Sequence, residues 1–453
     1  MLSENGNRLS QIFSYVRNAP IWDEYTKWQI FVFLFGALAI IYLMLNIFTS
    51  LTNKTPPPFT EVKVSTNDMD SFEASLAGSI SSPVEKGSPV RILVDGPEFM
   101  DDLLLEIKNA NQSINITNYI WEDGQFGNTL LRALIDKANE GVKVRLLLDG
   151  IGGRKADKKY IADLKKAGGE VAYFRPVTWW NITRINRRNH VREFVIDGRI
   201  AYMGGVAIAD NWLGDGTSKK FWHDFMFKVS GIMAEKSGQI FSNMWSQTTG
   251  EIFANSKRDA YVGESSAPQN NIRFISLFST PAPDMSANME HFIWLSIKAS
   301  QNSVHIENPY LVPSQALLKV LKEKAKSGVD VKIIVPGKNT DTKIVQWASQ
   351  SYYYELLDAG VKIYEYEPTR IHSKIMIIDG KWSVVGSANL DNRSSQLNLE
   401  AIMGVEDSVL AQNLEDQFQK DLKKSAEITN DHWKRKIILR PFGLLSRLFV
   451  HQF

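Results

Sequence analysis

The chain of 453 residues contains no cysteine, which excludes disulfides, thiolate metal sites and cysteine nucleophiles. Its net charge of +2, from 52 basic and 50 acidic residues, is close to neutral and argues against attraction of the whole protein to nucleic acid. Its length suffices for two or three domains with large cores. Histidine is also scarce, so any catalytic histidine belongs to a short set: His190, His223, His291, His305, His372, His432 and His451.

Charged residues are missing from one long segment. Residues 28–51, WQIFVFLFGALAIIYLMLNIFTSL, contain no charged side chain. As a helix they would extend roughly 36 Å, which is enough to cross a bilayer. The segment begins late for a signal peptide and keeps bulky residues to its end. We therefore expect one transmembrane helix after an N-terminal segment, 1–27, with a buried core helix as the alternative. The flanking cations leave the membrane face of the rest of the chain open.

Two other parts of the chain have a composition unlike that of a globular core. Residues 52–89 are polar and serine-rich and include three consecutive prolines, which predicts a tether. Residues 426–453 mix cations with bulky apolar residues, which predicts an amphipathic segment at the membrane interface. A helix packed on the protein is the alternative for the second of these.

A further aromatic and basic segment precedes His190. The stretch VTWWNITRINRRNH has no counterpart of similar length before His372. Tryptophan suits the bilayer interface and arginine suits lipid phosphates, although a single-stranded nucleic-acid groove also pairs aromatic residues with cations. The uncharged segment favours the lipid interpretation. The residues concerned are Trp179, Trp180, Arg184, Arg187 and Arg188.

The rest of the chain contains an internal repeat. SINITNYIW, GVKVRLLLDG and AGGEVAYFRP follow one another within residues 113–176, and SVHIENPYL, GVDVKIIVPG and AGVKIYEYEP within 303–368. In each passage, short β-rich runs alternate with segments of helical period, which predicts βαβ units and mostly parallel sheets. We expect an α/β fold of two pseudo-twofold-related domains, 90–260 and 261–425.

Each passage ends in the same kind of motif. HSKIMIID begins at His372 and is followed by GSAN, giving the form HxKx4D and then GSxN. His372 and Lys374 are two residues apart, so on an extended chain they point to the same side. The imidazole can attack phosphorus or move a proton while the cation holds a phosphate oxygen. Ser387 and Asn389 add uncharged donors.

The first copy of the motif is HVREFVID, which begins at His190 and has the same internal spacing. Two copies at equivalent places in a repeat favour a functional pair over two structural histidines. This copy departs from the second in two ways. Arg192 replaces the lysine and keeps its charge in a longer, planar group. Gly205 and Ala207 replace the serine and asparagine, so the first half offers fewer donors, and Gly205 is the candidate there for binding or orienting the phosphate.

Four carboxylates accompany the motifs. Glu400 and Asp224 are candidates to orient the histidines, because a carboxylate that accepts from one ring nitrogen fixes the tautomer of the other. An ordinary salt bridge is the alternative for each. Asp197 and Asp379 end the motifs, and we expect them to anchor the turn after the strand rather than take part in the chemistry.

The chain resembles the phospholipase D superfamily, and within it the bacterial cardiolipin synthase group. The resemblance covers residues 90–425 and rests on RNHVREFVIDGRIAYMGG, AIADNWLGD, SQSYYYELLDAGVKIYEYEP and IHSKIMIIDGKWSVVGSANLDNRS. It implies one active site between the halves, a covalent phosphohistidine intermediate, and no metal or other cofactor. By the family pattern His190 is the nucleophile and His372 the general acid, although the sequence leaves the two roles exchangeable.

The resulting hypothesis is a membrane phosphatidyltransferase of the cardiolipin synthase type. Its partners would be phospholipid substrates, phosphatidylglycerol or cardiolipin, and the membrane, without nucleic acid; the oligomeric state stays open. Two alternatives are a phospholipase D or other phosphodiesterase, including a nuclease, and a weakened lipid-binding homologue.

Overall fold

The computed structural model describes residues 27–52, 62–178, 185–253, 272–280 and 287–429. The chain divides into two units, Met1–Lys54 and Thr55–Phe453. In the first unit, helix α2 (Lys27–Thr52) forms where the uncharged segment lies, and Trp28, Phe33 and Leu38 on it are exposed. Within the described parts of the chain, no helix combines the length and apolar character needed to cross a membrane. The predicted transmembrane helix is therefore not confirmed.

The second unit contains two sheets. The smaller has seven strands in the order β2-β8-β7-β6-β3-β4-β5. Its strands are β2 (Arg91–Val94), β3 (Ser113–Asn118), β4 (Lys143–Asp149), β5 (Glu170–Phe174), β6 (Glu193–Ile196), β7 (Ile200–Gly204) and β8 (Phe225–Ser230).

The larger sheet has nine strands in the order β1-β9-β15-β14-β13-β10-β11-β12-β16. Without its edge strands β1 and β16, this order matches that of the smaller sheet strand for strand, which confirms the internal repeat. The strands are β1 (Glu85–Lys86), β9 (Arg273–Ser279), β10 (Ser303–Glu307), β11 (Asp330–Pro336), β12 (Lys362–Tyr366), β13 (Ile375–Ile378), β14 (Trp382–Gly386), β15 (Glu400–Glu406) and β16 (Ser425–Ile428).

The prediction of mostly parallel sheets is wrong, because both sheets are mixed and largely antiparallel. Among the described strands only β3–β4, β4–β5, β10–β11 and β11–β12 pair in parallel. The strands of the two histidine motifs instead continue through short turns into antiparallel partners, β6 into β7 and β13 into β14. A turn this short permits only antiparallel pairing, whereas a parallel pair needs a long crossover.

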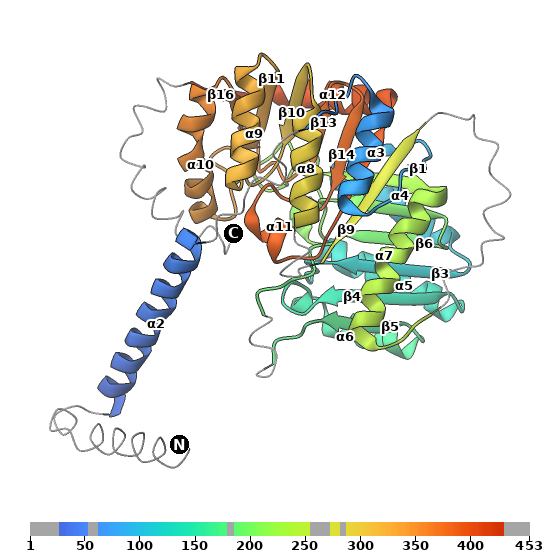
Figure 1. The fold of residues 1–453 in the computed structure, drawn as a ribbon. Helices are drawn as coiled ribbons and strands as arrows, with labels where there is room; N and C mark the ends of the chain where they lie inside the picture. The colour runs from blue at the N-terminus through green and yellow to red at the C-terminus, as the bar shows by residue number, and fades with distance from the viewer. Residues whose placement is uncertain (1–26, 53–61, 179–184, 254–271, 281–286, 430–453) are drawn as a thin grey trace, which may run out of the picture. The chain divides into compact units, whose positions relative to one another are not determined.

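Helices cover the sheets, and Figure 1 shows α8, α9 and α10 side by side near β10 and β11. The apolar stripes of α4, α5 and α6 pack on one face of the smaller sheet, and α7 packs on the other face. The helices are α4 (Asp95–Asn109), α5 (Gln125–Asn139), α6 (Lys158–Lys166), α7 (Gly231–Thr249), α8 (Ala287–Ala299), α9 (Gln315–Lys326), α10 (Lys343–Asp358), α11 (Asn392–Gln396) and α12 (Ser408–Leu422).

Part of the predicted tether is folded. Residues 69–80 form α3 (Met69–Ile80), whose N-terminus is capped by the Asp68 side chain. Phe72 and Leu76 on this helix are fully buried in the core of the larger sheet, and β1 adds to that sheet by pairing with β9. The apolar residues of α3, spaced four apart, explain why this polar stretch folds onto the domain.

The two halves share a hydrophobic core. Val195 and Phe227 of the smaller sheet belong to the same buried cluster as Ile375 and Val405 of the larger sheet, together with Leu414 of α12. The sheet faces that carry the two histidine motifs are therefore held against each other by packing, and residues from both halves can form one site.

Candidate active site

The two motif histidines lie just before β6 and β13, in segments that pair with the opposite half. The backbone N–H of His190 donates to the carbonyl of Leu399 at 2.9 Å, and the N–H of His372 donates to the carbonyl of His223 at 2.7 Å. Leu399 directly precedes Glu400. Because His223 likewise precedes Asp224, each half delivers a carboxylate to the histidine of the other.

His190 is paired with Glu400. Its Nδ1 lies 2.8 Å from Oε1 and 3.0 Å from Oε2 of the carboxylate, which is fully buried. The hydroxyls of Ser387 and Ser394 donate to the two oxygens of Glu400 at 2.6 and 2.7 Å. Burial acts to raise the pKa of Glu400, but the interaction with His190 and these hydrogen bonds outweigh it and lower the pKa. Glu400 is thus a fixed anion aimed at Nδ1.

Arg192 contacts the other ring nitrogen of His190. Its Nη2 donates to Nε2 at 2.9 Å, and its Nη1 donates to the His190 carbonyl at 3.1 Å. This pattern requires hydrogen on Nδ1 and a lone pair on Nε2. Burial, followed by the Arg192 charge, lowers the pKa of His190 to about 4. The ring is therefore neutral at physiological pH, as a nucleophile has to be.

His372 has the equivalent arrangement with Asp224. Its Nδ1 lies 2.6 Å from Asp224 Oδ2, which also accepts from Nε1 of Trp212 at 3.0 Å. Lys374 Nζ lies 3.1 and 3.2 Å from the two ring nitrogens. Trp212 and Trp222 flank the ring, with centroids 5.4 and 5.5 Å away.

Burial dominates the electrostatics of this second pair. It raises the pKa of Asp224 to about 6 against the opposing pull of Lys374. Burial, followed by the charge of Lys374, holds the pKa of His372 well below its usual range. The pKa of Lys374 is itself lowered well below its usual value by burial. Basic groups crowded into a buried site in this way favour the binding of an anion, which would raise their pKa values again.

Gly205 does not have the position expected of a phosphate donor. Its backbone N–H donates to the carbonyl of Phe225 at 3.1 Å. A Cβ at this position would lie 2.1 Å from Asp224 Oδ1, so the glycine makes room for that carboxylate. In the second half Ser387 occupies the equivalent place and donates to the longer Glu400. Trp212 supplies the corresponding donor to Asp224.

Asn389 is placed beside the same loop. It is buried, its backbone N–H donates to Ser394 Oγ at 3.0 Å, and its side-chain Oδ1 has no hydrogen-bond partner in the described part of the chain.

The two aspartates that end the motifs accept hydrogen bonds from backbone N–H groups. They lie at the end of each motif strand that is farther from the histidine. Asp197 accepts from the N–H groups of residues 111–113 at 2.7 to 2.9 Å. Asp379 accepts from those of residues 301–303 at 2.6 to 2.7 Å. Both have positive φ, near 51° and 53°, at the turn that follows the strand. These bonds tie the motif strand to the start of β3 or β10, which is what the predicted anchoring role requires.

An arginine stands two residues before each histidine, and the sequence motifs did not connect either arginine with the site. Arg188 pairs with Asp149 at 3.4 Å, and Arg370 pairs with Asp341 at 2.6 Å. Arg370 also donates to the Tyr310 hydroxyl at 2.9 Å. Both arginines are buried. The repeated RxH pattern, in RNH and RIH, is the signal that identifies them.

Of the residues predicted to face the membrane, one is buried and several lie outside the described residues. Arg188 was expected to face lipid, but it is 1% exposed, because its guanidinium is turned inward to Asp149 and to the carbonyl of Arg175. Trp179, Trp180 and Arg184 lie outside the described residues, as does most of the predicted amphipathic segment, from residue 430 onward.

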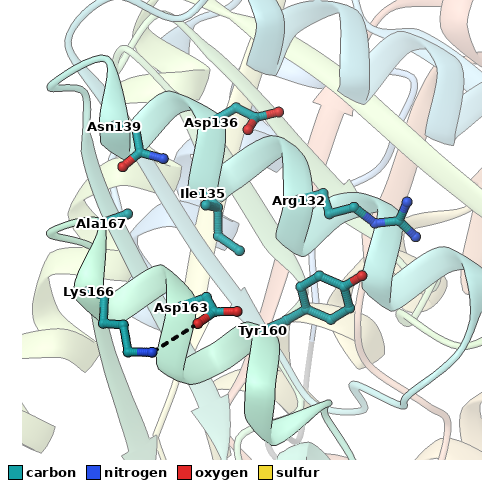
Figure 2. Close-up of a pocket in the computed structure, with 8 residues that line it drawn as sticks. All are labelled: Arg132, Ile135, Asp136, Asn139, Tyr160, Asp163, Lys166 and Ala167. Carbon is teal, nitrogen blue, oxygen red and sulfur yellow. Dashed lines mark hydrogen bonds and ion pairs between the residues drawn. The ribbon is translucent and has the colours of Figure 1, made fainter.

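A surface hollow lies away from these motifs. It measures about 460 Å³ and lies between α5 and α6, with Arg132, Tyr160 and Lys166 on its walls (Figure 2). Lys166 is paired there with Asp163 at 3.3 Å. None of the motif residues lines it, so the candidate chemistry is not in this hollow.

Known proteins are similar to this chain in sequence and in fold. The family model described as cardiolipin synthase, phospholipase D-like domain, matches residues 103–245 and 293–422. A cardiolipin synthase of Geobacillus sp. (strain WCH70) is 35% identical over 369 residues, which are 81% of this chain and 73% of that protein. Cardiolipin synthase 2 of Bacillus cereus is 35% identical over 364 residues, 79% of this chain and 70% of that protein.

Solved structures with low sequence identity show the same fold. The phosphatidylserine synthase of Haemophilus influenzae matches with a TM-score of 0.65 at 17% identity, covering 84% of this chain and 96% of that one. The polyphosphate kinase of Porphyromonas gingivalis matches with a TM-score of 0.51 at 12% identity, covering 83% and 52%. Together with the family model and its relatives, the duplicated motifs establish that this chain belongs to the cardiolipin synthase family of phospholipase D-like proteins.

Proposed function

We propose that the protein is a membrane phosphatidyltransferase of the cardiolipin synthase type that works through a phosphohistidine intermediate. Its family membership makes it an enzyme of the phosphatidyltransferase or phospholipase D type. The observation that carries the finer proposal is the pair of crossed histidine–carboxylate contacts, His190 with Glu400 and His372 with Asp224. Each histidine depends on the opposite half, so the two halves act as one site.

In the first step Nε2 of His190 attacks the phosphorus of a phosphatidylglycerol. Glu400 keeps hydrogen on Nδ1, so the lone pair stays on Nε2 and the positive charge that develops on the ring is stabilised. A phosphorus–nitrogen bond forms as the bond from phosphorus to the glycerol oxygen breaks. Arg192 and Lys374 hold the non-bridging oxygens, with Arg192 releasing Nε2 to do so.

His372 supplies the proton that the departing glycerol needs. Burial, followed by the charge of neighbouring cations, lowers its pKa. A bound phosphodiester anion offsets those cations, and Asp224 stabilises the imidazolium, so substrate binding favours the protonated form. Because a neutral imidazole attacks an anion without the repulsion that hydroxide meets, two easier steps replace one difficult one.

In the second step a hydroxyl of another lipid gives its proton to His372 and attacks phosphorus. The phosphorus–nitrogen bond breaks and His190 is regenerated. With a second phosphatidylglycerol as acceptor the products are cardiolipin and glycerol. With water as acceptor the product is phosphatidic acid, and the enzyme is a phospholipase D.

Membrane attachment through residues 28–51 belongs to the same proposal. It rests on the absence of charge from this segment and on the exposed apolar side chains of α2. A lipid with two acyl chains stays in the bilayer, so an enzyme that joins two such lipids needs its site held at the surface.

The altered first motif favours a second candidate, a weakened enzyme that binds lipid but turns over slowly. Arg192 occupies Nε2 of His190, and Ala207 stands where the second half has an asparagine. The hydrogen bonds to the two orienting carboxylates count against a weakened enzyme. Asp224 accepts from Trp212, and Glu400 accepts from Ser387 and Ser394.

A lipid profile tests the proposal. The protein and its His372→Ala variant are expressed in a host without cardiolipin synthases, and total lipid is analysed by mass spectrometry. Cardiolipin that appears with the parent and disappears with the variant is the expected result. Phosphatidic acid in its place would mean hydrolysis, and an unchanged profile with protein present in the membrane would contradict turnover and favour lipid binding.

A further inference from the structure

A second buried polar group lies beside the candidate active site, centred on His223. Its Nδ1 lies 2.8 Å from Asp95 Oδ1, and its Nε2 lies 3.1 Å from Asp421 Oδ2. Ligand atoms of His223, Glu307 and Asp421 all lie within 4.8 Å of one another, and all three residues are buried. Asp95 and His223 come from the first half, and Glu307 and Asp421 from the second. The group therefore joins the halves.

Two carboxylates of this group each have one oxygen without a donor among the described residues. Oε2 of Glu307 accepts from Ser373 Oγ at 2.7 Å, but its Oε1 has no hydrogen-bond partner among the described residues. Oδ2 of Asp421 accepts from Gln417 at 3.0 Å, whereas its Oδ1 has no such partner there, and Lys424 Nζ stands 4.0 Å away. Buried carboxylate oxygens that accept no hydrogen bond from the protein are costly, and coordination of a cation would offset that cost.

The charges point to a cation. Asp95, Glu307 and Asp421 bring three carboxylates to one imidazole, so the group is negative even when His223 is protonated. The Tyr366 ring stacks on His223 with centroids 5.5 Å apart, and its hydroxyl also has no hydrogen-bond partner among the described residues. Three buried carboxylates beside one imidazole thus leave this group short of positive charge.

The contact between Asp95 and His223 is typical of a metal ligand. A histidine that binds a metal through one nitrogen almost always donates its other N–H to a carboxylate, which fixes the tautomer. Asp95 stands in that place at Nδ1, which leaves Nε2 directed at the two carboxylates of the second half. One imidazole nitrogen and two carboxylates form a ligand set that suits zinc.

We propose that His223, Glu307 and Asp421 bind one divalent transition-metal ion of the zinc class, with Asp95 orienting His223. Zinc takes nitrogen and carboxylate oxygen at about 2.0 to 2.2 Å, so ligand atoms already within 4.8 Å of one another need to close in by only about an ångström. The ion has no part in the phosphoryl chemistry proposed above. Its role is structural, because it ties four chain segments together across the two halves.

The site is connected to the active site through the backbone. The carbonyl of His223 accepts from the N–H of His372, and Asp224 is the next residue in the chain. On the other side, Ser373, which follows His372, donates to Glu307. An ion here would hold both His372 and its carboxylate in position.

Metal titration tests the proposal independently of activity. The detergent-solubilised full-length chain is stripped with EDTA, dialysed, and titrated with zinc by calorimetry, with metal content checked by mass spectrometry. We expect about one zinc per chain and a melting temperature that rises with zinc and falls with EDTA. A chain that shows no saturable zinc binding would overturn the proposal.

Isosteric variants locate the site. Glu307→Gln and Asp421→Asn should each weaken zinc affinity at least 100-fold, and Asp95→Asn, which removes the orienting charge, should weaken it 10- to 100-fold. Asparagine tolerates the left-handed backbone at position 95, where φ is 63°. Zinc bound equally well by Glu307→Gln and Asp421→Asn would overturn the assignment, and either variant suffices if the other fails to fold.

The matched control is His305, which also lies between two carboxylates, Glu415 at 2.7 Å and Asp330 at 3.4 Å. There Asp330 is neutralised by Lys332 and Lys362 at 2.6 and 2.9 Å. Glu415→Gln should therefore leave zinc stoichiometry and affinity unchanged. An equal loss of zinc in this variant would show that the ion is bound elsewhere.

Discussion

Glu400, which begins a strand of the second half, lies 2.8 Å from Nδ1 of His190 in the first half. The pseudo-equivalent contact of Asp224 with His372 runs in the opposite direction, at 2.6 Å. Neither half therefore contains a complete histidine–carboxylate pair of its own. Duplication has produced one composite site, in which each motif is oriented by its copy.

Removing the charge of either orienting carboxylate should cost activity without unfolding the protein. Glu400→Gln keeps the shape but leaves the His190 tautomer free to invert, so we expect turnover to fall about 10²- to 10⁴-fold. Asp224→Asn should behave similarly through His372. The measurement is transfer rate in lipid–detergent micelles, with circular dichroism as a check on folding. Full activity in Glu400→Gln would contradict an orienting role.

Arg192 should be replaceable by lysine but not by a neutral residue. Its Nη2 reaches Nε2 of His190 at 2.9 Å, and the position has to supply one cation to the phosphate. We expect Arg192→Lys to keep turnover within about threefold, and Arg192→Met to lose about 10- to 100-fold, since hydrogen bonds to charged groups are worth about 1.5 to 3 kcal/mol. A gain of more than tenfold in Arg192→Lys would show instead that the arginine weakens this enzyme.

The pKa of His190 gives a test that depends on pH. Burial and Arg192 lower that pKa to about 4, so the ring should stay neutral from pH 8 down to about 5 and titrate only near 4. In the unfolded chain this histidine would bind a proton near pH 6.5. The folded protein should therefore lose stability as the pH falls from 6.5 towards 4. Imidazole ¹⁵N shifts, assigned with His190→Gln, report the titration. A midpoint near 6.5 would contradict the proposed environment.

Membrane retention should depend on both ends of the chain. Residues 28–51 supply a long uncharged segment, and residues 430–453 mix basic with apolar side chains. We expect deletion of either end to leave the protein in the membrane fraction, and deletion of both to release it. Cell fractionation with and without 1 M salt measures this. Complete release after removal of residues 1–52 alone would show that the C-terminal segment does not bind.

Sequence patterns identified the residues that the fold brings together better than they identified how those residues pair. The equal spacing of the two motifs identifies His190 and His372, and an acidic residue after each motif drew attention to Asp224 and Glu400. Which carboxylate serves which histidine is decided by tertiary pairing, in backbone contacts such as that of His190 with Leu399. No local pattern encodes such a contact.

The errors of prediction have physical causes as well. The short turn after Asp197 forces β6 and β7 into a hairpin, so the expectation of mostly parallel sheets fails there. Residues 69–80 looked like a tether because their apolar residues, Phe72, Leu76 and Ile80, are few, yet a core to pack against suffices to fold them. From the sequence, Gly205 indicated only the loss of a hydrogen-bond donor. The structure shows that a side chain at this position would collide with the carboxylate of Asp224.

Trapping the covalent intermediate tests the central claim most directly. The protein and its His372→Ala variant are mixed with phosphatidylglycerol, quenched in milliseconds to seconds, and digested under alkaline conditions that preserve phosphoramidates. The account predicts a phosphatidyl adduct on the peptide containing His190, absent from His190→Ala. Turnover with no adduct on either histidine, or full activity in His190→Ala, would contradict a composite site that works through a phosphohistidine.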